Sequence, residues 1–400
     1  MTFPYWCVCL TKSEPILNGT DRLCFAPAER SGAAEFPLEP PLPPRPRFKT
    51  EFCGREIAEA AKSKNAMTNF SKNLLWITII VLVIGGFALL RNNRSSESTK
   101  VRIGVVTVPH VSLVKIAFDK GFFREEGVEV ETKEFTAGKF ALQALIGGSL
   151  ELTTVAELPV VLATINGEKL SVVSVINETV GGIPMILRKD GDTFDPKTYF
   201  SKKRKIATTI GAGVEFFTAE FFKKYEIPAS QYEIVGMKPE DIPIVFANGD
   251  VDGIAIFEPF TSFAIQKAGE DKVFNIKDSD LYSEIMILVG KENWVLQNEK
   301  TIEKVLRALK KAETFSRDNP KESIEIVSSL TKLDEETLNG IWGTFTKQLG
   351  LNNSLISTME REAQWAKDTG KVPKETAIPN FRDMIFEMSL KKVSPFAVEL

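Results

Sequence analysis

A repeated order of apolar segments constrains the fold of this chain more than any other feature. From residue 100, runs typical of strands alternate with segments that are apolar at helical spacing. The first unit reads KVRIGVVTV (100–108), SLVKIAFDKGFF (112–123), VEVETKEF (128–135), KFALQALIGG (139–148) and ELTTVAEL (151–158). The same order returns about one hundred residues later, from KRKIATTIG (203–211) to DGIAIFE (252–258). Such alternation predicts an α/β chain with parallel sheets covered by helices.

Two further apolar stretches predict how the repeated units are joined. Residues 171–191 follow the first unit and residues 281–294 follow the second, so the chain crosses out and back as two connecting strands. We expect residues 101–187 and 283–400 to form one lobe and residues 188–282 the other. The helical segments after Trp294 are expected to pack on the first lobe.

Cysteine and histidine usage excludes several kinds of catalytic site. All four cysteines lie in the first 53 residues, and the only histidine is His110. Residues 101–400 therefore cannot provide a cysteine nucleophile, a Cys/His zinc site or a Ser-His-Asp triad with a spare histidine. The sequence has no phosphate-binding glycine loop and no dinucleotide fingerprint, so we expect no cofactor and no metal. The net charge of −3 shows no excess of basic residues of the kind that nucleic-acid binding requires.

The N-terminal hundred residues differ from the rest in composition. Residues 74–90 form an uncharged apolar run that ends at Arg91 without a small-residue cleavage site, which predicts a membrane anchor within an anchor-and-linker segment, 67–99. Met67 begins a typical secretory start. We therefore expect residues 1–66 to be either a disordered tail or a segment upstream of the true start.

Ligands of open parallel sheets bind beyond the carboxyl ends of the strands. In this chain we expect that edge to carry Thr107, Pro109, His110, Val111, Gly138, Ala156, Glu157, Gly211, Gly213, Val214 and Glu258; Ser112 joins this set through the family resemblance described below.

Two glutamates in this set end corresponding strands. Gly148-Ser-Leu-Glu-Leu aligns with Gly249-Asp-Val-Asp-Gly, which places Glu157 opposite Glu258 at the mouth of a cleft. Each could contact ligand, but Glu258 could equally cap a backbone N–H or form a salt bridge across the hinge. His110 could contact ligand, be an N-cap partner or be exposed. The glycine-rich IGAGVE (210–215) could hold an anion by its N–H groups, or be only a turn.

The segments VRIGVVTVPHVSLVKIAFDKGFFREEGVEVETKEF, ALIGGSLELTTV and NGDVDGIAIFEPF resemble the solute-binding proteins of ABC importers for nitrate, sulfonates and taurine. The same fold family includes pyrimidine-binding and thiamine-precursor synthase proteins. The resemblance implies a type II periplasmic-binding-protein fold that closes around one small ligand. It also implies ligand contacts at 108–112, Gly138, Ala156, 211–214 and Glu258. Glu157 departs from the small or hydroxyl residue usual in the family, which argues against an anionic ligand.

The resemblance also implies a function without chemistry. We expect a membrane-tethered, periplasmic binding protein that passes a small solute (a sulfonate, nitrate, taurine or a pyrimidine) to an ABC permease and its ATPase. A thiamine-precursor synthase-like enzyme is one alternative, although such relatives use several cysteines and more than one histidine. A ligand-sensing domain that signals through its anchor is the other.

Overall fold

The computed structural model describes residues 99–179, 181 and 183–400. The predictions for residues 1–66, the start at Met67 and the anchor at 74–90 lie outside this range and stay predictions. Among the helices in the described range, none is both long and apolar enough to cross a membrane.

The first sheet has the strand order β2-β1-β3-β10-β4. Its strands are β1 (Thr99–Val106), β2 (Val128–Phe135), β3 (Leu152–Ala156), β4 (Leu170–Thr179) and β10 (Glu284–Lys291). β1 runs parallel to β2 and β3, whereas β10 runs antiparallel to β3 and β4. The strands are apolar and almost fully buried at the centre of the sheet, as expected when helices cover both faces.

The second sheet repeats this topology, with the order β7-β6-β8-β5-β9. Its strands are β5 (Met185–Arg188), β6 (Arg204–Thr208), β7 (Tyr232–Gly236), β8 (Gly253–Ala255) and β9 (Val273–Ile276). In both sheets the fourth strand of the order comes from the connector and runs antiparallel to its neighbours. The predicted internal repeat is confirmed. The expected parallel pairing holds among the repeated strands, but the sheets are mixed, because each chain crossing delivers a strand in the reverse direction.

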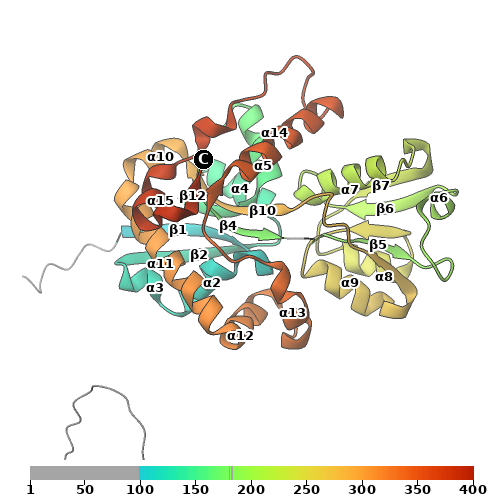
Figure 1. Ribbon diagram of the computed structural model, residues 1–400, viewed down its shortest axis with the longest axis horizontal. Coiled ribbons are helices and arrows are strands. Elements are labelled where there is room, and N and C mark those ends of the chain that lie inside the picture. Colours follow the sequence, from blue (N-terminus) through green and yellow to red (C-terminus); the bar gives the residue numbers. More distant parts are fainter. Residues whose placement is uncertain (1–98, 180, 182) are drawn as a thin grey trace, which may run out of the picture. The chain divides into compact units, whose positions relative to one another are not determined.

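The crossover between the sheets starts earlier than predicted. β5 begins at Met185 and belongs to the second sheet, so the expected boundary after residue 187 falls inside a strand. We call the first sheet with its helices lobe 1 and the second sheet with its helices lobe 2 (Figure 1).

The helices of each lobe begin just after the strands that they follow. Lobe 1 has the short 3₁₀ turn η1 (Pro109–Val111), α2 (Ser112–Asp119), α3 (Phe122–Glu125), α4 (Gly138–Ile146) and α5 (Glu157–Ile165). Lobe 2 has α6 (Pro196–Tyr199), α7 (Gly213–Lys224), α8 (Ile242–Asn248) and α9 (Phe260–Ala268). In the segment 112–123, Gly121 stops the helix as its sequence predicts: its φ of 75° is left-handed, and it separates α2 from α3.

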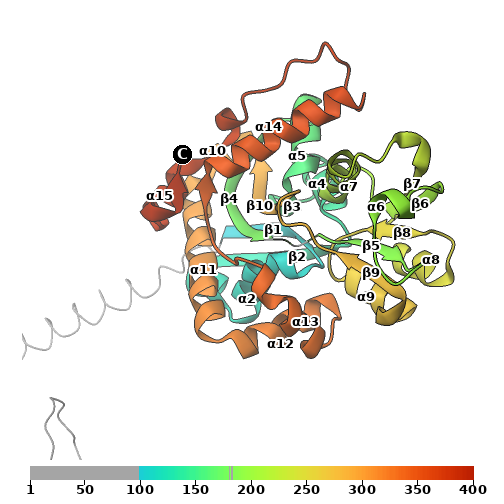
Figure 2. The ribbon, with the colours of Figure 1, turned by 45° about the vertical axis from the view of Figure 1, so that its right-hand side comes forward.

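The C-terminal part is helical, as predicted, but it does not contact lobe 1 alone. It comprises α10 (Glu292–Gln297), α11 (Glu299–Asp318), α12 (Pro320–Thr331), α13 (Glu335–Ile341), α14 (Asn353–Asp368) and α15 (Glu387–Val393). α11 packs on α2, whereas α14 lies along α5 and reaches α7 of lobe 2 (Figure 2). The rings of Trp365 and Phe216 lie 5.5 Å apart there, and Arg361 pairs with Glu220 at 3.3 Å. α14 therefore bridges the lobes.

Candidate ligand-binding cavity between the lobes

A small cavity lies where the carboxyl ends of the strands of both lobes meet, and we call it the inter-lobe cavity. Its lining residues are Val106, Val108, His110, Gly138, Lys139, Ala156, Pro159, Ala212, Phe257, Glu284 and Met286. All of them belong to lobe 1 except Ala212 and Phe257, which lobe 2 contributes. The cavity volume is about 20 Å³, and a water molecule needs roughly 10–15 Å³ by this measure. An organic solute can therefore enter only if the lobes separate.

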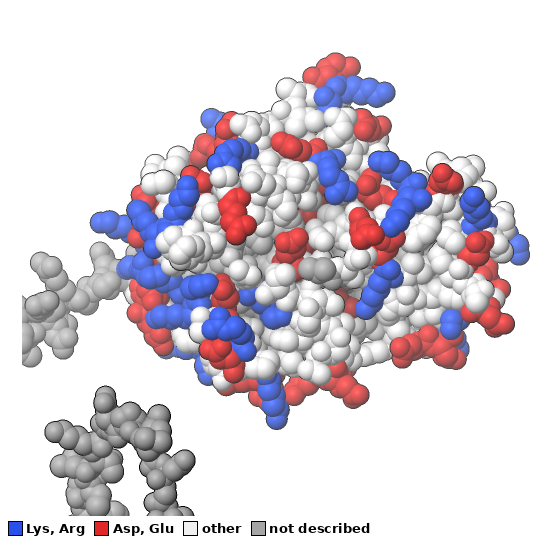
Figure 3. Space-filling model, in the orientation of Figure 1, with Lys and Arg blue, Asp and Glu red and all other residues white. Residues whose placement is uncertain are grey.

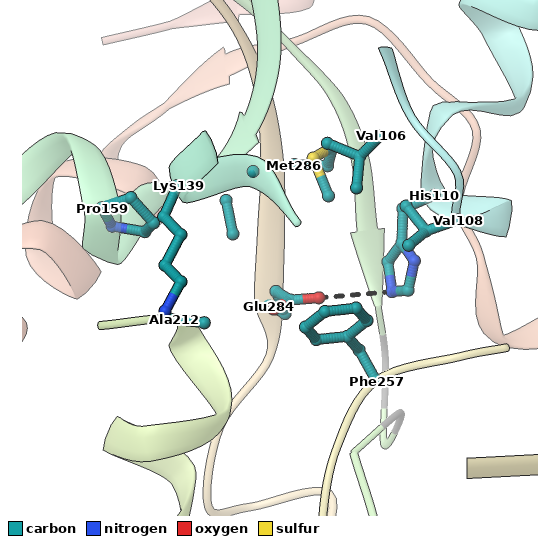
Figure 4. A pocket seen from close by; sticks show the side chains of 11 residues that line it. Val106, Val108, His110, Lys139, Pro159, Ala212, Phe257, Glu284 and Met286 are labelled. Atoms are coloured by element: carbon teal, nitrogen blue, oxygen red, sulfur yellow. Dashed lines mark ion pairs between the residues drawn. The ribbon is translucent and has the colours of Figure 1, made fainter. Parts of the chain in front are cut away.

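His110 and Glu284 form the polar centre of this cavity. The 3₁₀ turn after β1 directs the imidazole toward the first residue of β10, and His110 Nε2 lies 3.4 Å from Glu284 Oε2 (Figure 4). Both side chains are almost completely buried. Burial lowers the pKa of His110 to about 3 and raises the pKa of Glu284 to about 7. Because burial outweighs the neighbouring carboxyl group, the contact joins a neutral imidazole to a carboxyl group and is not an ion pair.

Glu157 lies behind the cavity and not at its mouth. It is the first residue of α5 and fully buried, and its carboxylate accepts hydrogen bonds from the Tyr282 hydroxyl at 2.5 Å and from the Ile285 N–H at 3.1 Å. Burial and the charge of Glu284 raise the pKa of Glu157 to about 8. The fully buried Glu362 of α14 is a third member of this cluster, and burial followed by the charge of Glu157 raises its pKa. Despite these carboxyl groups, no group of three or more side chains placed to hold a metal occurs among the described residues.

The glycine turn before α7 is already occupied by carboxylates of the protein. The Gly211 N–H donates to Glu215 Oε2 at 2.8 Å, and Gly211 has a left-handed φ of 78°. A methyl group added at Gly213 would lie 2.4 Å from the Tyr282 hydroxyl oxygen and 3.0 Å from Glu284 Oε1. Gly213 is therefore required for the close approach of α7 to the start of β10.

Glu258 caps a helix. Its Oε2 atom accepts a hydrogen bond from the Ser262 N–H at 3.1 Å, in the first turn of α9, and a cis peptide bond joins it to Pro259. The side chain is half-buried, and burial raises its pKa. This contact is the backbone cap that the sequence left open as one alternative for Glu258. Glu258 is not among the residues that line the cavity.

Of the twelve residues predicted from the sequence, His110, Gly138 and Ala156 line the cavity. Pro109, Val111 and Ser112 are buried beside His110 in the same turn, and the Ser112 hydroxyl has no partner among the described residues. Thr107 donates its N–H and its hydroxyl to the Phe135 carbonyl oxygen. Val214 is buried in α7. A ligand contact at any of the twelve stays a prediction.

Glu284 and Lys139 line the cavity but were not among the residues predicted from the sequence. Glu284 directly precedes the apolar run 285–289, so it is a charged residue at the edge of a buried strand. Glu258 was predicted from the same kind of pattern. Lys139 follows Gly138 at the start of α4. Its Nζ donates to the Ile210 carbonyl oxygen at 2.8 Å, which joins lobe 1 to lobe 2 beside the cavity.

Two sheets of repeated topology, joined by two crossings and enclosing a cavity at their carboxyl edges, define a periplasmic-binding-protein fold. The sequence agrees: the profile of the NMT1-like family matches residues 94–331, and the chain belongs to that family.

Relatives of this chain bind small solutes. A Bacillus subtilis protein whose name assigns it to the binding of aliphatic sulfonates is 21% identical over 319 residues, 78% of this chain and 94% of the relative. The periplasmic aliphatic sulphonate binding protein SsuA from Escherichia coli superposes with a TM-score of 0.62 at 20% identity, over 72% of this chain and 98% of SsuA. The nitrate-binding protein NrtA from Synechocystis superposes with a TM-score of 0.59 at 15% identity, over 75% and 89% of the two chains. The predicted resemblance is confirmed.

Proposed function

We propose that this protein is the solute-binding component of an ABC importer. The observation that carries the proposal is the inter-lobe cavity, which both lobes line at the edge where parallel strands end, in a chain of the NMT1-like family. Its relatives are named as binding proteins for aliphatic sulfonates, nitrate and taurine. A small solute of these kinds, or a pyrimidine, would enter the open cleft and be enclosed when the lobes close.

Closure is the mechanism, and contacts across the lobes support it. Lys139 bonds to the Ile210 carbonyl oxygen, and Lys371 pairs with Glu215 at 2.5 Å. A ligand that binds both lobes adds contacts that exist only in the closed state and so shifts the population toward it. We further propose that the domain works on the extracytoplasmic side of the membrane, held by the segment 74–90, and delivers its solute to a permease and an ATPase.

Binding without turnover tests this function. The full chain, purified in detergent, is incubated with nitrate, alkanesulfonates, taurine, pyrimidines and simple amines, and unfolding temperatures are recorded. Any stabilising solute is then recovered from the protein and weighed by mass spectrometry. We expect at least one saturable ligand, recovered unchanged. Conversion of the bound solute would instead support the thiamine-precursor synthase-like enzyme.

A further inference from the structure

Carboxyl groups of the protein lie at the starts of α5 and α7, two helices that begin beside the cavity, whereas α4 begins with the lining residues Gly138 and Lys139. A helix N-terminus attracts anions, because its first N–H groups are unpaired and its dipole is positive there. At α7, Glu215 accepts the Gly211 N–H, and Glu284 Oε1 lies 3.0 Å from the position of a Cβ on Gly213. At α5, Glu157 is the first helical residue. A solute that approaches these two helix starts meets acidic side chains, whose oxygens can accept hydrogen bonds from N–H donors.

Positive charge at the cavity is limited to one side chain among its lining residues, Lys139. Its ammonium group already bonds to the Ile210 carbonyl oxygen, and burial lowers its pKa against the opposing charge of Glu215. Figure 4 shows Glu284 between Lys139 and His110. Behind Glu284 lie Glu157 and Glu362, which are both fully buried and whose pKa values burial raises.

This concentration of acidic groups is a property of the interior. On the face shown in Figure 3, Lys and Arg side chains are intermixed with Asp and Glu. Surface pairs such as Arg361–Glu220 balance each other locally. Beside the cavity, Glu215 is paired with Lys371, whereas no ion pair of Glu157 or Glu362 with a lysine or arginine occurs in the part of the chain that the structure describes.

Two further lining groups match a nitrogen ligand. His110 Nδ1 is buried and has no partner among the described residues, and in a neutral imidazole whose Nε2 carries the proton it is a free acceptor for an N–H. The Phe257 ring lines the cavity next to Glu284 (Figure 4). An aromatic face attracts a cation.

We propose that the inter-lobe cavity binds a solute through a cationic or N–H-donating nitrogen, such as an organic ammonium, an amidinium or an amino-substituted heterocycle, and not through an anionic group. Glu284 accepts from that nitrogen, His110 Nδ1 accepts a second N–H, and Phe257 contacts the face of the charged group. The proposal rests on the proposed function, since it needs the lobes to open for a solute.

Matched pairs of an N–H-donating compound and an anion test this proposal on the full chain. The pairs are acetamidinium with acetate, ethylammonium with ethanesulfonate, and 4-aminopyrimidine with pyrimidine-4-carboxylate, each titrated at neutral pH with thermal unfolding and calorimetry as readouts. We expect at least one nitrogen member to bind saturably and no anionic member to bind. Saturable binding of an anionic member overturns the charge assignment but leaves the binding function standing. Failure of every nitrogen member also overturns the charge assignment.

Two Glu→Gln variants locate the contact. Glu284→Gln removes the charge from the cavity, and we expect a ten- to hundredfold loss of affinity for the nitrogen ligand, as for loss of a charge-assisted hydrogen bond. Glu151→Gln is the control. Glu151 pairs with Arg102 before β3, and Ala156 of the cavity ends that strand, about 16 Å away at 3.3 Å per residue. Equal affinities of wild type and Glu284→Gln contradict the assignment.

Discussion

Tyr282 donates a hydrogen bond of 2.5 Å to Glu157, and both side chains are buried between the lobes. Tyr282 lies on the connector that returns from lobe 2, two residues before β10, and Glu157 begins α5 of lobe 1. The ring of Tyr282 also packs edge-on against Phe216 of α7, 5.5 Å between centroids. This one hydrogen bond therefore joins the connector to the carboxyl cluster behind the cavity.

Removing the Tyr282 hydroxyl should destabilise the protein. In Tyr282→Phe a buried carboxyl group loses a donor, and an unsatisfied buried acceptor costs about 1–3 kcal/mol. Chemical denaturation measures the change in the free energy of unfolding. Tyr225→Phe is the matched control, because its hydroxyl bonds to Asp278 at 3.2 Å in a less buried position. Equal losses of stability in both variants would show that burial does not increase the contribution of the hydrogen bond between Tyr282 and Glu157.

Stability should fall as the pH rises from 6.5 to 8. The folded protein keeps a proton on Glu157 up to about pH 8, whereas the unfolded chain releases it near pH 4.5. The folded state therefore binds more protons in this interval, and each such proton lowers the free energy of unfolding by about 1.4 kcal/mol per pH unit. Glu284 and Glu362, whose pKa values burial also raises, act in the same direction.

The interval from pH 6.5 to 8 lies between the ranges in which two other groups make stability rise with pH. His110, with a folded pKa of about 3 against 6.5 in the unfolded chain, increases stability only as the pH rises toward 6.5. Burial lowers the pKa of Lys347 to about 8 from 10.5, so this residue increases stability with rising pH only above pH 8. Glu157→Gln should reduce the slope between pH 6.5 and 8 in urea titrations. An unchanged slope would mean that Glu157 is ionised in the folded protein.

An apolar pattern predicts the order of strands and helices in this chain, but not strand direction or long-range side-chain partners. The periodicity predicted the repeated strand and helix order because each buried element needs its own apolar face. The direction of β5 and β10 was not predictable, since a fully buried strand has the same pattern in either direction. Glu157 was expected at the cleft mouth because it follows Ala156 at the strand end, but α5 begins at that residue and its carboxylate meets Tyr282, 125 residues away in sequence. Long-range partners of this kind are not visible in a local pattern.

Glu258 should matter for folding through its cap. Glu258→Ala removes the acceptor of the Ser262 N–H, and loss of a helix cap costs about 1 kcal/mol. Glu258→Gln keeps a side-chain oxygen and should retain most of the stability. Thermal unfolding without ligand separates the two variants. If Glu258→Gln instead lowers affinity ten- to hundredfold at unchanged stability, Glu258 contacts ligand as the sequence suggested.

Gly213 should not tolerate a side chain. In Gly213→Ala the new methyl group meets the Tyr282 hydroxyl and Glu284, so α7 must move away from β10. Overpacking of this kind costs about 1–3 kcal/mol, and the affinity for a cavity ligand should fall with it. Gly191→Ala is the control, because no atom of the described residues lies within 4 Å of its added methyl group. Wild-type stability and affinity in Gly213→Ala would show that this close approach is not needed.

Hydrogen exchange tests closure around a solute most directly. Exchange of the full chain is followed by mass spectrometry with and without the matched-pair solute that gives the largest thermal shift. We expect protection in residues 137–141 at the start of α4 and in residues 211–215 at the start of α7, because both lobes contact the enclosed ligand. The central part of α11, which contributes no residue to the cavity lining, should exchange equally in both samples. Protection confined to one lobe, or protection in neither, would contradict binding by lobe closure.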